Sequence, residues 1–214
     1  MYNTTYEQLV FRNIEAGDTI MIENEVLKAI HERRSTRKYL DTQISKEQLD
    51  TLLDAAIWAG SGGNNQSWLF TAIQNRDMLR KINEIVREGF LSYVPDDDYP
   101  GKHAAKIQSK RDDYCFYLNA PTLVIASNVP NYENAMADCS LALQNIFLAA
   151  QSIGLGSCYV NQLHWLRNDK GLRDYLFELG IPKEHTICSS AVIGYIDIPS
   201  NAPARKEGTI NIIY

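Results

Sequence analysis

Residues 141–160 read Leu-Ala-Leu-Gln-Asn-Ile-Phe-Leu-Ala-Ala-Gln-Ser-Ile-Gly-Leu-Gly-Ser-Cys-Tyr-Val, and this stretch decides the fold class. Apolar residues cover much of the helix surface that its first half would form, which predicts a central, largely buried helix over about 133–153. Gly154 then stops this helix, because glycine readily takes the left-handed conformation found at many helix ends. Ser157 to Val160 reads as a short strand that follows the stop.

Further helices and strands are predicted on both sides of this stretch. The helices cover about 24–33, 45–59, 77–87, 103–117 and 165–179, and the strands cover 68–73, 122–126 and 186–196. Ser45, with Gln48 three residues later, forms a capping-box pattern at the start of the second helix. Helices precede, separate and follow the strands, so the chain is predicted to be an α+β protein.

The predicted domain organisation is an N-terminal arm over residues 1–23 followed by one domain over residues 24–214. Residues 89–102 are rich in proline, glycine and aspartate, and they predict a long irregular excursion. Such a segment in a compact domain is either a functional lid or a disordered insertion. Substrate choice is expected to reside there.

The composition is that of a globular protein. Of 214 residues, 45% are hydrophobic and 22% charged, and the formal net charge is -5. This charge argues against bulk binding to nucleic acid, which relies on a basic surface, but it allows a local basic pocket. The start of the chain has no basic and apolar signal pattern, and no apolar run is long enough to span a bilayer. The sequence therefore predicts a cytoplasmic protein without membrane or nucleic-acid partners.

The four cysteines predict free, buried thiols. Cys115, Cys139, Cys158 and Cys188 form no C-x-x-C pair, and no histidine stands at metal-ligand spacing from any of them. A structural zinc or iron–sulfur site is therefore not expected.

A basic segment, Arg33-Arg34-Ser35-Thr36-Arg37-Lys38, is a candidate phosphate site. Guanidinium groups beside a hydroxyl suit a dianionic phosphate, because each guanidinium can donate two parallel charge-assisted hydrogen bonds. A structural alternative is that these cations complement the C-terminal dipole of the preceding helix.

Three other segments have the composition of a ligand site. Ser61-Gly-Gly-Asn-Asn-Gln-Ser-Trp68 contains small residues that permit close approach of a ligand, although a helix-to-strand turn has the same composition. Gly154 to Asn161 brings backbone N–H groups out at a strand end, although a helix stop followed by a strand explains this segment as well. Arg205 and Lys206 are two cations near the C-terminus, where a solvated surface run is the alternative.

The order and spacing of these segments resemble the nitroreductase family. The family's R-R-S-x-R pattern is matched by Arg33, Arg34, Ser35 and Arg37; its A-P-S-x-x-N-x-Q-P-W pattern is matched by Ala59, Ser61, Asn64, Gln66 and Trp68. Its helix ending in G-L-G is matched by residues 154–156, and its closing basic pair by residues 205–206. The resemblance extends over about residues 24–214.

The resemblance implies a nitroreductase-like fold, with a mostly antiparallel central sheet flanked by helices, in an intertwined homodimer that binds FMN. Arg33, Ser35, Arg205 and Lys206 would hold the FMN phosphate. Arg37 would lie along the ribityl chain or reach the flavin N1/O2 edge, where a cation stabilises the reduced ring. Asn161 and Gln162 would present backbone near N5, and the loop from the other subunit would close the pocket. The implied cofactor residues are Arg33, Arg34, Ser35, Arg37, Ser61, Gly62, Asn64, Gln66, Asn161, Gln162, Arg205 and Lys206.

The chain departs from the family pattern at two places. Gly60 and Ser67 replace prolines of the loop, which predicts a looser backbone. The family places an asparagine and a lysine before the strand that corresponds to residues 121–126, where this chain has Asp113 and Phe116. The flavin's pyrimidine edge would then lack a usual cation.

The activity implied is reduction of nitroaromatics, quinones or enones by NADH or NADPH through a two-step ping-pong reaction. No side chain acts as nucleophile or general base, because the flavin N5 carries the chemistry. No G-x-G-x-x-G follows a strand, so no Rossmann site for the nicotinamide is expected. Alternatives are another flavin reaction on the same fold, such as dehalogenation or heterocycle oxidation, a non-catalytic FMN-binding or storage protein, and a domain without a cofactor. The physiological acceptor and the choice between NADH and NADPH stay open.

Overall fold

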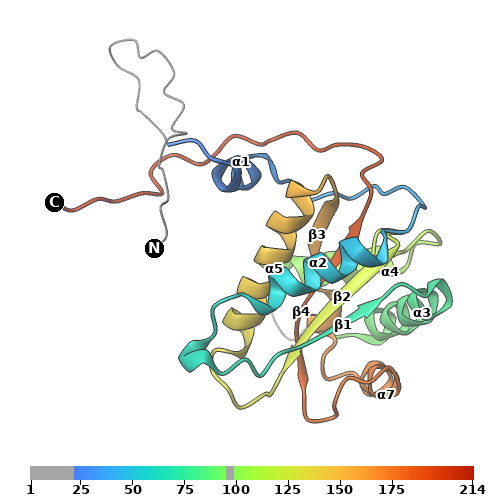
Figure 1. Cartoon of the computed structure of the whole chain (residues 1–214). Coiled ribbons are helices and arrows are strands. Elements are labelled where there is room, and N and C mark those ends of the chain that lie inside the picture. The colour runs from blue at the N-terminus through green and yellow to red at the C-terminus, as the bar shows by residue number, and fades with distance from the viewer. Residues whose placement is uncertain (1–21, 95–98) are drawn as a thin grey trace.

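The structure, a computed structural model, describes residues 22–94 and 99–214 (Figure 1). Its elements in chain order are α1 (Glu25–Glu32), α2 (Lys46–Ile57), the 3-10 turn η1 (Gly62–Asn64), β1 (Leu69–Ile73), α3 (Arg76–Ser92), α4 (Pro100–Ser109), β2 (Thr122–Asn128), α5 (Ala135–Ser152), β3 (Gly156–Val160), α6 (Gln162–Trp165), α7 (Lys170–Glu178) and β4 (Thr186–Gly194).

The four strands form one antiparallel sheet in the order β1-β2-β4-β3. Alternate residues of β2 face opposite sides, since side chains alternate along a strand: Val124 packs with α2 and α5, and Leu123 packs with α3, α6 and α7. Figure 1 shows α2 and α5 lying across one face of the sheet. Helices therefore cover both faces, and the predicted α+β class with a central antiparallel sheet is confirmed.

Helix α5 is central and largely buried, as the sequence predicts. Ala142, Leu143, Ile146 and Ala150 have no exposed surface, because they meet the sheet and α2. Gly154 has φ +76°, the left-handed conformation expected at this helix stop. The strand that follows is β3, so this helix-to-strand junction forms as the sequence predicts.

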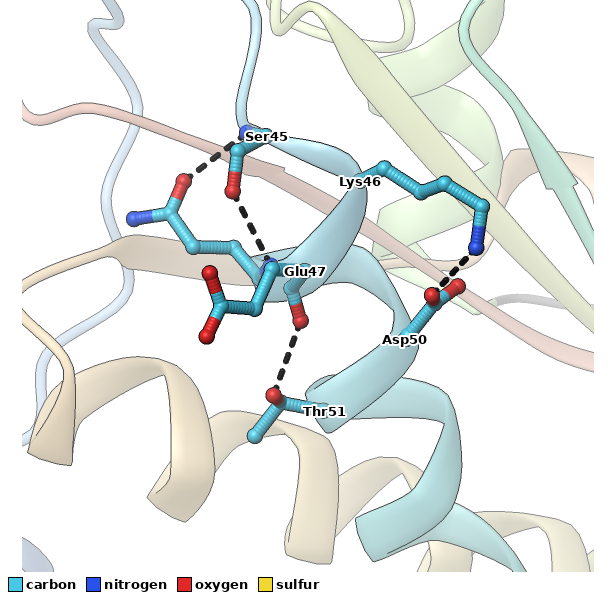
Figure 2. A network of polar contacts seen from close by, with 6 residues as sticks. Ser45, Lys46, Glu47, Asp50 and Thr51 are labelled. Atoms are coloured by element: carbon cyan, nitrogen blue, oxygen red, sulfur yellow. Dashed lines mark hydrogen bonds and ion pairs between the residues drawn. The ribbon is translucent and has the colours of Figure 1, made fainter.

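Helix α2 begins with the predicted capping box. The Ser45 hydroxyl accepts from the Gln48 backbone N–H, and the Gln48 side chain accepts from the Ser45 backbone N–H. Figure 2 shows this turn, together with the Lys46–Asp50 ion pair and the hydrogen bond from the Thr51 hydroxyl to the Glu47 carbonyl. The helix ends at Ile57, two residues before the predicted end of the helical segment.

The predicted irregular excursion over residues 89–102 is wrong at both ends. Helix α3 continues to Ser92, because Phe90 extends its apolar face and is completely buried. Helix α4 already begins at Pro100, a residue suited to the first helical turn. The irregular part that the structure describes is thus limited to residues 93–94 and 99, and residues 95–98 lie outside the described residues.

Two predicted helices also have different bounds. The helix expected over 103–117 ends at Ser109, and the Asn83 side chain holds the following turn by donating to Tyr114 O and accepting from Phe116 N. The helix expected over 165–179 is two helices, because Asp169 caps a new start by accepting from Leu172 N at 2.8 Å. The N-terminal arm lies outside the described residues except for residues 22–23, which are exposed.

The cysteines are free thiols, of which Cys139, Cys158 and Cys188 are buried and Cys115 is half-buried. Within residues 22–94 and 99–214, no helix combines the length and the hydropathy that crossing a bilayer requires.

Candidate functional site

The basic segment after α1 docks onto the first half of β3. Ser35 forms an isolated parallel bridge with Ser157, and the Thr36 backbone N–H donates to the Ser157 carbonyl at 2.9 Å. Thr36 is 3% exposed and packs over Gly156, where an added Cβ would lie 2.5 Å from the Thr36 hydroxyl. The glycine at the first position of β3 therefore permits the basic segment to sit against the strand.

The guanidinium groups of this segment carry charge that no nearby carboxylate neutralises. Arg33 lies over the Phe147 ring at 6.0 Å, Arg34 Nη1 donates to the Arg33 carbonyl at 2.6 Å, and Arg37 Nη1 donates to the Ser35 carbonyl at 3.2 Å. In the described part of the chain, none of the three forms a salt bridge. Unneutralised cations beside a hydroxyl are a donor set that fits a phosphate.

Strand β3 is an edge strand of the sheet, and from Ser157 onward it runs away from the basic segment. The Ser157 carbonyl points outward to Thr36, so the backbone of Tyr159, two residues on, points outward too. Asn161 follows the strand and Gln162 begins α6. Asn161 stands about 13 Å from Ser157, four residues at roughly 3.3 Å each. The two groups of predicted site residues thus lie at the two ends of one edge strand.

The loop at residues 61–66 has an unusual backbone that small residues and amides allow. Gly63, Asn64 and Gln66 all have positive φ (60°, 56° and 48°). The Ser61 hydroxyl accepts from the Gln66 backbone N–H at 3.2 Å, and Gln66 Nε2 donates to the Asn64 side-chain oxygen at 2.6 Å. The three predicted residues Ser61, Asn64 and Gln66 therefore belong to one connected loop whose backbone is held from within.

Asp138 and Tyr132 hold the same loop against α5. The Gly62 backbone N–H donates to the Asp138 carboxylate at 3.2 and 3.3 Å, and the Tyr132 hydroxyl lies 2.9 Å from both the Gly62 carbonyl and Asp138 Oδ2. A Cβ on Gly62 would lie 2.2 Å from the Asn134 amide nitrogen and 2.6 Å from the Tyr132 hydroxyl. Only glycine therefore fits at position 62 without displacing these side chains.

Within one chain the loop and the basic segment lie apart. Asp138 contacts the loop near the start of α5, whereas Phe147, nine residues later, contacts Arg33. Nine residues of helix correspond to about 14 Å along the axis at 1.5 Å per residue. The structure thus joins the basic segment to β3 and keeps residues 61–66 at the other end of α5.

The predicted C-terminal cations follow a segment that passes the basic segment. The Asp197 backbone N–H donates to the Lys38 carbonyl at 3.1 Å, and the Ser200 hydroxyl donates to the Ser35 carbonyl at 3.2 Å. Arg205 and Lys206 are exposed, in a tail without helix or strand that Figure 1 shows leaving the body of the chain. The structure therefore brings the base of the tail to Ser35.

Sequence reasoning missed Tyr39, Tyr132 and Asp138. The Tyr39 hydroxyl donates to the Thr36 carbonyl at 2.7 Å, and burial raises the pKa of Tyr39 far above its ordinary range. Cys158 lies close to Tyr39, and burial also raises the pKa of this thiol. Asp138 had a visible signal, an acidic residue on the apolar face of a buried helix, whereas Tyr39 and Tyr132 had none.

The two residues that depart from the family pattern have structural roles here. Asp113 accepts two hydrogen bonds of 2.8 Å from Arg111 at the surface. This hydrogen bonding lowers the pKa of the Asp113 carboxyl. Phe116 is 2% exposed and belongs to the core under α3. Neither supplies a free cation.

Comparison with known proteins places this arrangement in a family. The model of the Nitroreductase family matches residues 30–195. A protein of Archaeoglobus fulgidus, provisionally named NADH dehydrogenase/NAD(P)H nitroreductase, is 35% identical over 171 residues, which cover 80% of this chain and 85% of the relative. The FMN reductase [NAD(P)H] of Bacillus subtilis is 28% identical over 86% of this chain and 69% of its own length.

A solved structure has the same fold and a bound flavin. The nitroreductase of Bacteroides fragilis, crystallised with bound FMN, is 37% identical, has a TM-score of 0.83, and aligns over 90% of this chain and 100% of its own. The class of this molecule is therefore an α+β protein of nitroreductase fold. The chain belongs to the nitroreductase family, and the sequence-based prediction of an FMN-dependent oxidoreductase is confirmed at the level of that family.

Proposed function

We propose that this protein is an FMN-dependent NAD(P)H oxidoreductase that reduces electron-poor small molecules such as nitroaromatics, quinones or enones. The observation that carries the proposal is the docking of Ser35 and Thr36 onto Ser157, which fixes a cluster of unneutralised cations at one end of β3. Family membership and the flavin bound by the Bacteroides fragilis relative support it.

The phosphate end of the proposed FMN site is the basic segment. The guanidinium of Arg33 and the hydroxyl of Ser35 would bind the phosphate directly, and Arg34 would add positive charge beside them. Arg33 is held over Phe147, so its charge is positioned before the ligand binds. Arg205 and Lys206 would complete the phosphate site by a movement of the tail, whose base is already bonded to Ser35.

The ring end of the proposed site is the outer side of β3. When bound, FMN would supply two-electron hydride chemistry between the nicotinamide and the acceptor. Arg37 would place its charge at the N1/O2 edge, which stabilises the reduced ring. Asn161 and Gln162, at the far end of β3, would present backbone groups toward N5.

The proposed assembly is a homodimer in which residues 61–66 of one subunit close the flavin site of the other. The separation of this loop from Arg33 along α5 supports a contribution from a second chain. Exposed apolar side chains on α1, after α2 and on α5 support it as well, since they include Val26 at 63%, Ile30 at 45%, Trp58 at 79% and Leu141 at 52% exposure. Both α1 and α2 pack against α5, and large exposed apolar areas on a protein surface mark interaction sites.

The proposed reaction order is ping-pong. The nicotinamide would donate its hydride and leave before the acceptor occupies the same face of the ring. The protein's part is positioning and the exclusion of water, so no side-chain nucleophile or general base is invoked.

The absorption spectrum of the purified protein, recorded without air before and after NADH or NADPH, tests the proposal. A flavin spectrum that bleaches with either donor is expected. If the flavin stays oxidised with both donors, the protein is a flavin-binding protein and not an NAD(P)H oxidoreductase. A colourless preparation that takes up no added FMN would refute the flavin site.

A further inference from the structure

A second basic region lies around α7, on the face of the sheet opposite α5. Two adjoining cavities, of about 510 and 260 Å³, share five lining residues and so form one groove. The shared residues are Arg167, Asn168, Arg173, Lys183 and His185. None of the residues assigned to the flavin lines either cavity.

The three cations of the groove are held in place by backbone and ring contacts. Arg167 Nη1 donates to the His164 carbonyl at 3.0 Å, and Arg173 Nη2 donates to the Lys183 carbonyl at 3.1 Å. The Lys183 ammonium lies 4.3 Å from the centroid of the Phe177 ring. Each guanidinium has five N–H donors, so these contacts leave several donors available to a ligand.

Positive charge outweighs negative charge in the groove: its lining holds Arg167, Lys170, Arg173 and Lys183 against Asp174 and Glu184. No carboxylate forms a salt bridge with Arg167, Arg173 or Lys183 in the part of the chain that the structure describes. Asp174 lines the smaller cavity, where it pairs with Lys170 and also feels the charges of Arg173 and Lys183. The Asp169 side chain accepts from the Leu172 backbone N–H. Glu184 is the one acidic residue lining the larger cavity, against three cations. The groove is thus positive on a chain whose net charge is -5.

The smaller cavity is apolar at its base. Leu172, Leu176, Ile181 and Ile187 line it and are 0–4% exposed, and Pro182 adjoins them. A ligand that fills both parts would have an anionic head among the cations and an apolar body over these side chains. Guanidinium groups bind carboxylate and phosphate oxygens equally by paired hydrogen bonds, so the shared chemistry of the head is an oxyanion.

We propose that the groove between α7 and the start of β4 binds a small organic oxyanion, held by Arg167, Arg173 and Lys183. The site is separate from the flavin site and does not depend on the proposed oxidoreductase activity. Its charge, its volume and its apolar base fit an aromatic carboxylate or a phosphate monoester.

Titration of the full-length protein, saturated with FMN, with benzoate and with inorganic phosphate at constant ionic strength tests the proposal. Calorimetry would give affinities, and amide chemical shifts would locate the binding. Saturable binding with shifts confined to residues 129–131 and 167–187, which line the groove, is expected. Tighter binding of benzoate would assign the carboxylate with an aromatic body, and tighter binding of phosphate would assign the phosphate group. No saturable binding of either probe, or shifts at residues 33–37 instead, would overturn the site.

A matched pair of double variants separates a specific site from bulk charge. Arg173→Gln with Lys183→Gln is expected to weaken binding at least tenfold. Lys46→Gln with Arg80→Gln removes the same charge from α2 and α3 and is expected to change it less than twofold. Equal weakening in both double variants would overturn the proposal, because screening of the whole surface would then explain the binding. Lys183→Gln alone, at an exposed position, repeats the test with the smallest perturbation.

Discussion

The backbone N–H of Gly62 donates to both oxygens of the Asp138 carboxylate, at 3.2 and 3.3 Å. Asp138 is 3% exposed, so these hydrogen bonds join a surface loop to a buried side chain of α5. The Tyr132 hydroxyl closes the same network by contacting both partners. The backbone of the loop proposed to reach the second flavin site is thereby fixed by a buried helix.

Replacement of the buried carboxylate is expected to destabilise the protein. Asp138→Ala leaves the Gly62 N–H without its acceptor and removes one of the two acceptors of the Tyr132 hydroxyl, which costs about 2–4 kcal/mol of unfolding free energy. Urea unfolding of the two proteins measures the difference. Asp50→Asn, at an exposed position on α2, is the control and is expected to change the free energy of unfolding by less than about 0.5 kcal/mol. Equal stability of Asp138→Ala and wild type would contradict the structural role of the network.

A methyl group at position 62 is expected to displace the loop. Gly62→Ala brings its Cβ against Asn134 and the Tyr132 hydroxyl, whereas Gly60→Ala meets nothing within 4 Å. FMN affinity, measured by fluorescence quenching, is therefore expected to fall about tenfold or more in the first variant, which corresponds to about 1.4 kcal/mol, and to stay unchanged in the second. Similar affinities in both variants would separate the loop from flavin binding.

Removal of the Arg33 side chain is expected to weaken FMN binding. A hydrogen bond to a charged group contributes about 1.5–3 kcal/mol, so Arg33→Ala should lower affinity by about 10- to 100-fold. Lys28→Ala removes an exposed cation from α1, the helix that ends just before Arg33, and serves as the control. Equilibrium dialysis of FMN against each protein decides the matter, and unchanged affinity in Arg33→Ala would refute the phosphate assignment.

Stability is expected to fall in acid because of His164. Burial, the largest cause, lowers the pKa of His164 below its ordinary value of 6.5, and the nearby cations Arg167 and Lys102 act in the same direction. The His164 Nδ1–H donates to the Ile187 carbonyl at 2.8 Å, which opposes the shift. Above pH 6.5 the imidazole is neutral in both states. Below it the unfolded chain binds a proton that the folded chain does not, so the unfolding free energy declines until the folded pKa is reached.

The measurement is urea unfolding at pH 7.5 and at pH 5.5. His164→Gln keeps a donor for the Ile187 carbonyl and removes the titration, so a smaller loss of stability between the two pH values is expected. His31→Gln, at an exposed position of α1, is expected to behave as wild type. A wild-type pH dependence in His164→Gln would assign the effect to other groups.

The proposed homodimer is expected to depend on α1. Ile30 is 45% exposed in the single chain, and Ile30→Asp would bury a charge in the proposed interface. The variant should therefore have the mass of a monomer and should not retain FMN. Ile107→Asp, at a 67% exposed position on α4, should retain both. Sedimentation velocity reads the mass directly. A wild-type monomer that holds FMN would exclude the shared site.

The local parts of this protein follow from its sequence. The apolar run before Gly154 predicts a buried helix and its stop, because helical periodicity and glycine geometry act over a few neighbouring residues. The Ser45 capping box forms for the same reason. The bounds near residues 89–117 and 165–179 could not be predicted, since Phe90, Asn83 and Asp169 set them through tertiary packing and side-chain bonds to the backbone.

The candidate site divides in the same way. The sequence by itself determined which residues carry charge and that Gly154 ends a helix. The family that its patterns resemble is confirmed. Tertiary structure alone decided that Ser35 meets Ser157, that Asp138 holds Gly62, and that the loop stands apart from Arg33 along α5. The residues in these pairs are 76 to 122 positions apart in the chain, a separation over which no local sequence pattern acts. Only the packing of α5 and β3 fixes the distances between them.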